Sequence, residues 1–237
     1  MAKKLEKKHL LAIRWFHGIN FPILFLMIWS GILIYWANPV FSVRIFGYEL
    51  FHFFPQSFYG YLGIPFRLAE GLSLHFLFMW FFTINGILYV SYTIISGEWR
   101  ALLPVPGSFK RAIHVTLYDL GLRKELPPQG KYNDAQRIAY SSVILMAIGS
   151  VVTGFAIYKP TQLSWLTSLL GGYEWARWEH FWLMASFVMF FVVHIGQVIR
   201  AGWSNFRSMI TGREIVSSNE ALPTVEPVPA FDEGVNA

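Results

Sequence analysis

The stretch that decides the fold is WEHFWLMASFVMFFVVHIGQVIR, residues 178–200. It is an apolar run long enough to span a bilayer, which takes about 20 helical residues, and it carries a histidine near each end. His180 and His194 are fourteen residues apart. In a helix, that spacing places them about 40° apart around the axis and about 21 Å apart along it. Ionisable side chains are costly in lipid and mark functional sites, so these two histidines require a joint explanation.

The whole chain has the composition of a membrane protein. Its 237 residues are 54% hydrophobic and only 14% charged, whereas soluble domains have about 25% charged residues. The absence of cysteine excludes disulfides, Cys-ligated iron–sulfur clusters, covalently attached haem and thiol nucleophiles. The sequence predicts an all-α integral membrane domain over residues 1–213. Its four-transmembrane-helix bundle has spans at residues 15–36, 72–95, 138–158 and 178–199.

The distribution of basic residues predicts the orientation of the bundle in the membrane. Fifteen of the 19 Lys and Arg residues lie before the first span, between the second and third spans, or after the fourth. Basic loops favour the cytoplasmic side, so both termini are predicted to be cytoplasmic, in a bacterial inner (plasma) membrane. This asymmetry also accounts for the net charge of +5, and nucleic acid is not expected as a partner.

The segments between the spans predict short interfacial helices. Residues 109–122 repeat apolar side chains at helical spacing and predict a helix on the inner leaflet, and residues 159–179 predict another on the outer side. The aromatic-rich loop at residues 37–71 is either an interfacial segment or a docking surface for an outer protein. Residues 214–237 contain no Lys or Arg and predict a disordered acidic tail. No internal repeat is evident.

Two further histidines lie at depths that match those of the last span. Consecutive spans run in opposite directions, so His75 lies near the outer surface with His180, and His17 lies near the cytoplasmic surface with His194. Imidazole is a common metal ligand, and haem iron takes axial histidines. We therefore predict two haem b groups, one held by the His75/His180 pair and one held by the His17/His194 pair.

The four histidines could also serve helix packing alone. The chain would then be a redox-silent membrane anchor or assembly subunit. A transporter or proton channel would need acidic side chains at mid-membrane, and the four spans have none there. Gly31 lies fourteen residues after His17 on nearly the same face, at the outer level, and Gly86 lies eleven residues after His75 on nearly the same face but deeper. Each would leave room for the macrocycle held at the other level. Small residues at such positions also serve ordinary helix packing.

Five segments together carry a family resemblance. They are RWFHGIN (14–20), HFLFMWFFTINGILY (75–89), KYNDAQRIAY (131–140), TGFAIYKPTQLSWLTSLLGGYEWARWEHF (153–181) and FFVVHIGQV (190–198). They resemble the thiosulfate-reductase-type b cytochromes. These cytochromes are related to the gamma subunit of membrane formate dehydrogenase and to the nickel–iron hydrogenase cytochrome b subunit. The resemblance covers residues 12–213.

The resemblance implies a dihaem, quinone-reactive subunit in which the four paired histidines are the axial ligands. It implies a quinone near Asn133, with Lys131 and Tyr132 beside it, although this cluster also fits the start of a helix. Relatives often pair with a molybdopterin oxidoreductase on the outer side. This chain has no evident site for substrate chemistry and is expected to be non-catalytic alone. The expected function is electron transfer between such a partner and the membrane quinone pool.

Overall fold

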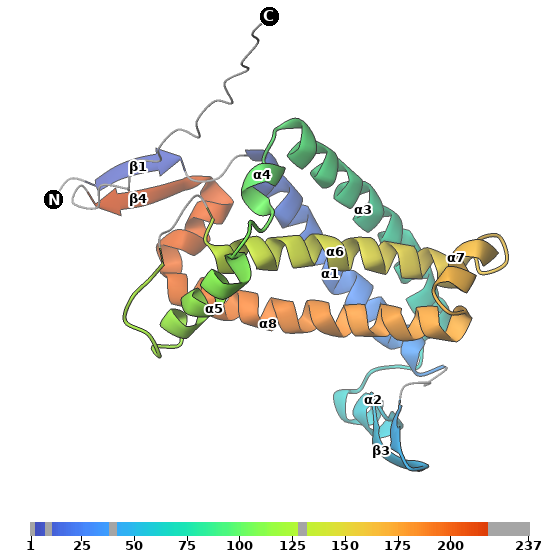
Figure 1. The fold of residues 1–237 in the computed structure, drawn as a ribbon. Coiled ribbons are helices and arrows are strands. Elements are labelled where there is room, and N and C mark those ends of the chain that lie inside the picture. Colours follow the sequence, from blue (N-terminus) through green and yellow to red (C-terminus); the bar gives the residue numbers. More distant parts are fainter. Residues whose placement is uncertain (1–2, 8–10, 38–41, 128–131, 218–237) are drawn as a thin grey trace, which may run out of the picture.

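Four long helices dominate the computed structural model, which describes residues 3–7, 11–37, 42–127 and 132–217 (Figure 1). Each is long and apolar enough to cross a membrane, and each overlaps one of the predicted spans. The predicted all-α, four-helix membrane fold is therefore confirmed. The four are α1 (Leu11–Tyr35), α3 (Leu68–Ile95), α6 (Asp134–Tyr158) and α8 (Tyr173–Thr211).

The long helices are arranged as two pairs. α1 packs along α3, and α6 packs along α8, whereas contacts between the two pairs are few (Figure 1). Large apolar side chains such as Phe25, Leu145 and Met189 remain exposed, as expected for a bundle that is surrounded by lipid. α8 is kinked at Gly202, whose φ of 83° lies in the left-handed region that glycine adopts readily. The candidate membrane span of this helix, Tyr173–Ser204, ends close to the kink.

Both ends of the described chain lie on one side of the bundle, which we call the terminal side. β1 (Lys3–Lys7) pairs antiparallel with β4 (Arg213–Ser217) there. The predicted disordered tail begins at residue 214, and the structure differs over residues 214–217. These residues belong to β4, because β1 offers their backbone groups hydrogen-bonding partners that composition does not reveal. Residues 218–237 lie outside the described residues.

The terminal side also carries the predicted inner surface helix, as α5 (Ser108–Asp119), preceded by the short α4 (Trp99–Leu102). Arg111 of α5 forms an ion pair of 2.6 Å with Asp134 at the start of α6. At the other end of α5, Asp119 pairs with Arg200 of α8 at 2.9 Å. α5 is thus held against both helices of one pair, with several apolar side chains left exposed, as suits a helix at a membrane surface.

The opposite side, which we call the loop side, carries the two remaining connections. The first is held to α1 by Tyr59, which is buried and donates a hydrogen bond of 2.8 Å to the carbonyl oxygen of Ile32. Burial raises the pKa of Tyr59 to about 12, so the phenol keeps its donor hydrogen at neutral pH. The second connection contains the other predicted surface helix. The loop-side elements are β2 (Ser42–Ile45), β3 (Tyr48–His52), α2 (Gln56–Leu62) and α7 (Ser164–Leu169).

Candidate functional site

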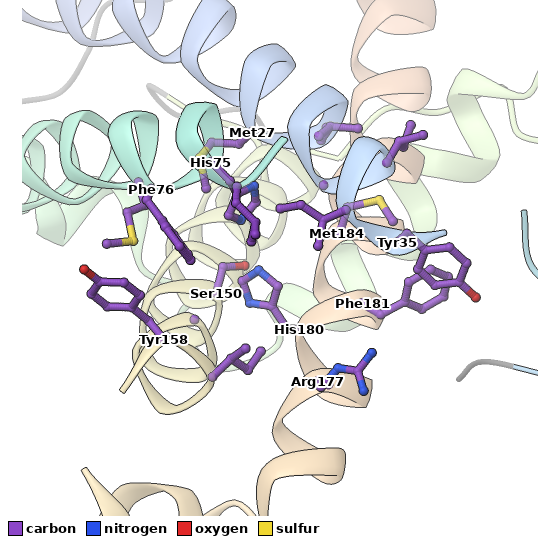
Figure 2. Close-up of a pocket in the computed structure, with 18 of the residues that line it drawn as sticks. Met27, Tyr35, His75, Phe76, Ser150, Tyr158, Arg177, His180, Phe181 and Met184 are labelled. Carbon is purple, nitrogen blue, oxygen red and sulfur yellow. The ribbon is translucent and has the colours of Figure 1, made fainter. Parts of the chain in front are cut away.

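Two histidines face each other near the loop side of the bundle. His75 comes from α3 and His180 from α8, so each helix pair contributes one. The centres of their imidazole rings lie 6.2 Å apart, and the rings are inclined at 72°. Figure 2 shows the two side chains approaching one another from the two helices. The structure therefore brings together the residues that the sequence analysis paired at the outer level.

His75 and His180 line a cavity of about 450 Å³ between the two helix pairs (Figure 2). Cavities that hold cofactors and other small ligands are about 300–1,000 Å³. The walls are largely apolar, with Met27, Phe76 and Met184 among the side chains that form them. The cavity is therefore large enough for a cofactor and mostly apolar in its lining.

A buried hydroxyl group contacts each histidine of this pair. Ser30 Oγ lies 2.9 Å from Nδ1 of His75, and Thr153 Oγ1 lies 2.9 Å from Nδ1 of His180. Ser30 is fully buried and Thr153 is 3% exposed. Neither contact was predicted from the sequence, although a glycine directly follows each hydroxyl residue and is a signal for both positions.

These two glycines keep the space beside the imidazole rings open. A Cβ atom at Gly31 would lie 3.8 Å from Cε1 of His75, and a Cβ atom at Gly154 would lie 3.3 Å from Cε1 of His180. Gly31 therefore lies at the level that the sequence analysis expected, beside the outer pair. Gly86 was expected to leave room at the inner level, and a Cβ atom there would meet nothing within 4 Å.

A second histidine pair lies toward the terminal side. His17 of α1 and His194 of α8 have ring centres 5.9 Å apart, with the rings inclined at 50°. Phe190 stacks on the His194 ring at a centre-to-centre distance of 5.8 Å and an angle of 12°. α8 is a regular helix between His180 and His194, so their separation along the axis is about 21 Å. The two pairs thus lie near opposite ends of the bundle.

Each histidine pair offers only two ligand nitrogens. In the parts of the chain that the structure describes, no group of three or more His, Cys, Asp or Glu side chains could hold a metal ion. A metal between two imidazoles, with bonds of about 2 Å as in zinc–imidazole sites, places the ring centres about 6 Å apart. Both pairs have this spacing. Because a porphyrin supplies the other ligands of its iron, both pairs fit the axial ligation of haem.

The residues expected near a quinone are partly described. Lys131 lies outside the described residues. Asn133 is the N-cap of α6: its side-chain oxygen accepts from the Gln136 backbone N–H at 2.8 Å, and the Gln136 side chain accepts from the Asn133 N–H at 3.0 Å. Tyr132 packs edge-on against Tyr140, with ring centres 5.4 Å apart. Asn133 therefore has a structural role at a helix start, and its role toward quinone stays a prediction.

The fold and the site define a class of protein, a four-helix membrane protein with two facing histidine pairs. Residues 8–212 match the prokaryotic cytochrome b561 family, and the chain belongs to that family. It is 32% identical over 201 residues to a provisionally named protein-methionine-sulfoxide reductase subunit, YedZ1, of Azospira oryzae. That region is 84% of this chain and 93% of the relative.

The family assignment confirms the resemblance to b cytochromes related to the nickel–iron hydrogenase cytochrome b subunit. The chain is a multi-pass bacterial membrane protein, and haem b is the cofactor that its family implies. It is therefore a membrane b-type cytochrome that functions in electron transport.

Proposed function

We propose that this chain is the dihaem membrane subunit of an oxidoreductase complex and passes electrons between an outer-face partner and the quinone pool. The observation that carries the proposal is the presence of two histidine pairs, with ring centres 6.2 and 5.9 Å apart, near opposite ends of the bundle. His75 and His180 would hold one haem b, and His17 and His194 would hold the other. Bound haem supplies one-electron redox chemistry.

The chain itself sets the distance between the two sites and their surroundings. One helix, α8, carries a ligand at each site, so its rise fixes their axial separation at about 21 Å. Apolar side chains such as Met27 and Met184 line the outer cavity. The polarity of the surroundings in turn affects the redox potential of a bound metal. The protein contribution is thus ligation, spacing and an apolar environment.

The name of the relative supports a catalytic partner for this chain. YedZ1 is named as a subunit of a protein-methionine-sulfoxide reductase. We infer that this chain also serves a separate oxidoreductase subunit, of the molybdopterin class that the family resemblance implies. The loop side offers an exposed aromatic surface for it, since Phe46, Tyr48 and Tyr61 are 97%, 77% and 91% exposed. Alternatively, this loop is an interfacial segment that contacts membrane lipid.

Haem stoichiometry tests the proposed function directly. The purified protein, reduced with dithionite, should show a b-type absorption spectrum and contain two haems per chain. One haem per chain would contradict a dihaem subunit. A protein without a reducible spectrum would instead favour the alternative that the histidines only pack and that the chain is a redox-silent anchor.

The terminal side is proposed to face the cytoplasm, because most basic residues lie there. The chain has no cysteine, so a single introduced thiol reports on one side of the membrane. Ser57→Cys, at an exposed position of α2, should react with a membrane-impermeant maleimide in intact spheroplasts. Lys124→Cys, which is also exposed, should react only after the membrane is permeabilised. The reverse labelling pattern would invert the proposed orientation.

A role of Asn133 in quinone binding can be separated from its role as a helix cap. Serine caps helices as well as asparagine does, whereas alanine costs about 1 kcal/mol. If the amide of Asn133 contacts quinone, Asn133→Ser should slow quinone turnover about tenfold, as expected for the loss of one hydrogen bond of about 1.4 kcal/mol. Its haem spectrum and Tm should stay unchanged, while Asn133→Ala should also lower the Tm. Wild-type turnover in Asn133→Ser would leave this residue with the capping role alone.

A further inference from the structure

Two short motifs occur twice in the chain, once in each helix pair. SGILIY (30–35) in α1 matches TGFAIY (153–158) in α6, and HFLFMWFF (75–82) in α3 matches HFWLMASF (180–187) in α8. The shared patterns are Ser/Thr-Gly-x-x-Ile-Tyr and His-Phe-x-x-Met-x-x-Phe. The expectation that the chain has no internal repeat is wrong at these motifs. Both motifs are short. From the hydroxyl residue of the first motif to the histidine of the second, the chain runs 45 residues in the first half (α1 and α3) and 27 in the second half (α6 and α8).

The repeated segments line the outer cavity with the same positions. On both α1 and α6, cavity-lining residues lie three and two positions before the hydroxyl residue and one, two, four and five positions after it. On both α3 and α8, they lie seven and three positions before the histidine and one, four and seven positions after it. The cavity is therefore a twofold site to which each helix pair contributes one equivalent half.

Contacts between the two halves repeat in the same way. Tyr35 of α1 packs against Phe181 of α8, with ring centres 5.5 Å apart. The equivalent residues, Tyr158 of α6 and Phe76 of α3, pack with ring centres 4.7 Å apart. Each tyrosine ends the first motif of one half, and each phenylalanine follows the histidine of the other half. The same tyrosine–phenylalanine contact therefore joins the two halves at both repeats.

The hydroxyl group of each half already donates its hydrogen to the backbone. Ser30 Oγ donates to the Met27 carbonyl oxygen at 3.1 Å, and Thr153 Oγ1 donates to the Gly149 carbonyl oxygen at 2.7 Å. A hydroxyl group has a single hydrogen to donate. A hydroxyl group that donates to the carbonyl oxygen accepts from the histidine, and the hydrogen then lies on Nδ1 of that ring. With this tautomer, Nε2 keeps its lone pair available for a metal.

We propose that Ser30 and Thr153 are equivalent positioning residues that fix the tautomer of His75 and His180 and raise the basicity of their Nε2 atoms toward haem iron. The inference rests on the proposed function, because it requires iron between these two rings. Hydrogen-bond partners of ligating histidines orient the rings, and their loss typically costs about 10–100-fold in metal affinity or activity. A more basic ligand favours oxidised iron, so losing either hydroxyl should raise the midpoint potential. A tenfold weaker preference for oxidised iron corresponds to about 59 mV.

Redox titration of variants of the full-length chain tests this inference. Thr153→Val preserves the shape of the side chain, and Ser30→Ala removes the equivalent hydroxyl group. Both should raise the potential of the outer haem by similar amounts and leave the inner haem unchanged. Thr153→Ser retains the hydroxyl group and should retain the wild-type potential.

Thr93→Val is the matched control. Thr93 of α3 is 4% exposed and donates to the Tyr89 carbonyl oxygen at 2.7 Å, the length of the corresponding bond of Thr153, but it is not among the residues that line the cavity. No bond to a histidine is found for Thr93 within the described chain, so its replacement should leave the potential of the outer haem unchanged. A shift confined to Thr153→Val and Ser30→Ala would therefore identify the histidine contact as its cause.

Loss of haem is also informative in these variants. If Thr153→Val loses the outer haem and Thr153→Ser keeps it, the hydroxyl group is required for ligation and the inference is supported. The inference is overturned if Thr153→Val keeps the wild-type potential, if Thr93→Val shifts the potential equally, or if Thr153→Ser loses the haem as well. Failure of the proposed function is distinct, because the wild-type protein would then lack the outer haem.

Discussion

His180→Ala is expected to remove one of the two haems and to leave the other in place. His180 supplies one of the two nitrogens at the outer cavity, and alanine offers no ligand there. The inner pair, His17 and His194, lies about 21 Å away along α8, so its ring spacing should be unaffected. The purified variant should contain one haem per chain instead of two, as measured by a pyridine haemochrome assay and by the dithionite-reduced spectrum.

The partner histidine provides a second test of the same pairing. His75→Ala should give the same loss, and the double variant should lose no more than either single variant, because residues of one site act as a unit. His114→Ala, at a histidine of α5 that belongs to neither pair, should retain both haems. Two haems in His180→Ala, or an additional loss in the double variant, would contradict the assignment of His75 and His180 to one haem.

The histidine pairs could be predicted because the order of the spans determines depth. Consecutive spans run in opposite directions, so histidines near the starts of α3 and α8 must lie on the same side of the membrane. The depth of each histidine does not depend on how the helices pack. The structure places the ring centres of His75 and His180 at 6.2 Å, and those of His17 and His194 at 5.9 Å.

The contacts of Ser30 and Thr153 could not be predicted in this way. A hydroxyl residue in an apolar helix can satisfy itself on the carbonyl group three or four positions earlier, so it gives no sign of a further partner. The histidine that it faces is defined only when α1 packs along α3 and α6 packs along α8. The repeat was hidden for a related reason, since the first half holds a β-hairpin and α2 between its motifs.

The repeat also relates each histidine of the inner pair to a tyrosine in the other half. Counted by the same offsets, the equivalents of His17 and His194 are Tyr140 in α6 and Tyr89 in α3. Each half thus has a histidine at its outer position. Of its two inner positions, one is a histidine and the other is a tyrosine. Tyr140 packs against Tyr132, whose pKa is raised to about 12 by burial and, next, by the charge of Glu98. Tyr140, the counterpart of His17, therefore adjoins the segment proposed to bind quinone.

His194→Ala is expected to stop electron exchange with quinone while the outer haem remains reducible. The inner pair lies on the terminal side with Asn133, and the outer pair is about 21 Å farther along α8. Without His194 the inner haem has lost one of its two protein ligands, and no electron carrier remains beside the proposed quinone segment. Reduction of the outer haem by a quinol analogue should slow by at least about 100-fold. Loss of a hydrogen-bond partner of a metal ligand already costs up to about 100-fold, and here the ligand itself is removed.

Two reductants separate this outcome from general damage to the protein. Dithionite should still reduce the outer haem of His194→Ala, and His17→Ala should behave in the same way because it removes the other ligand of the same pair. Phe190→Leu is the matched control on α8: it removes the ring that stacks on His194 but leaves the ligand in place, so quinol should still reduce both haems. If quinol reduced the outer haem of His194→Ala at the wild-type rate, electrons would not need the inner site. The order of the two sites in the pathway would then be wrong.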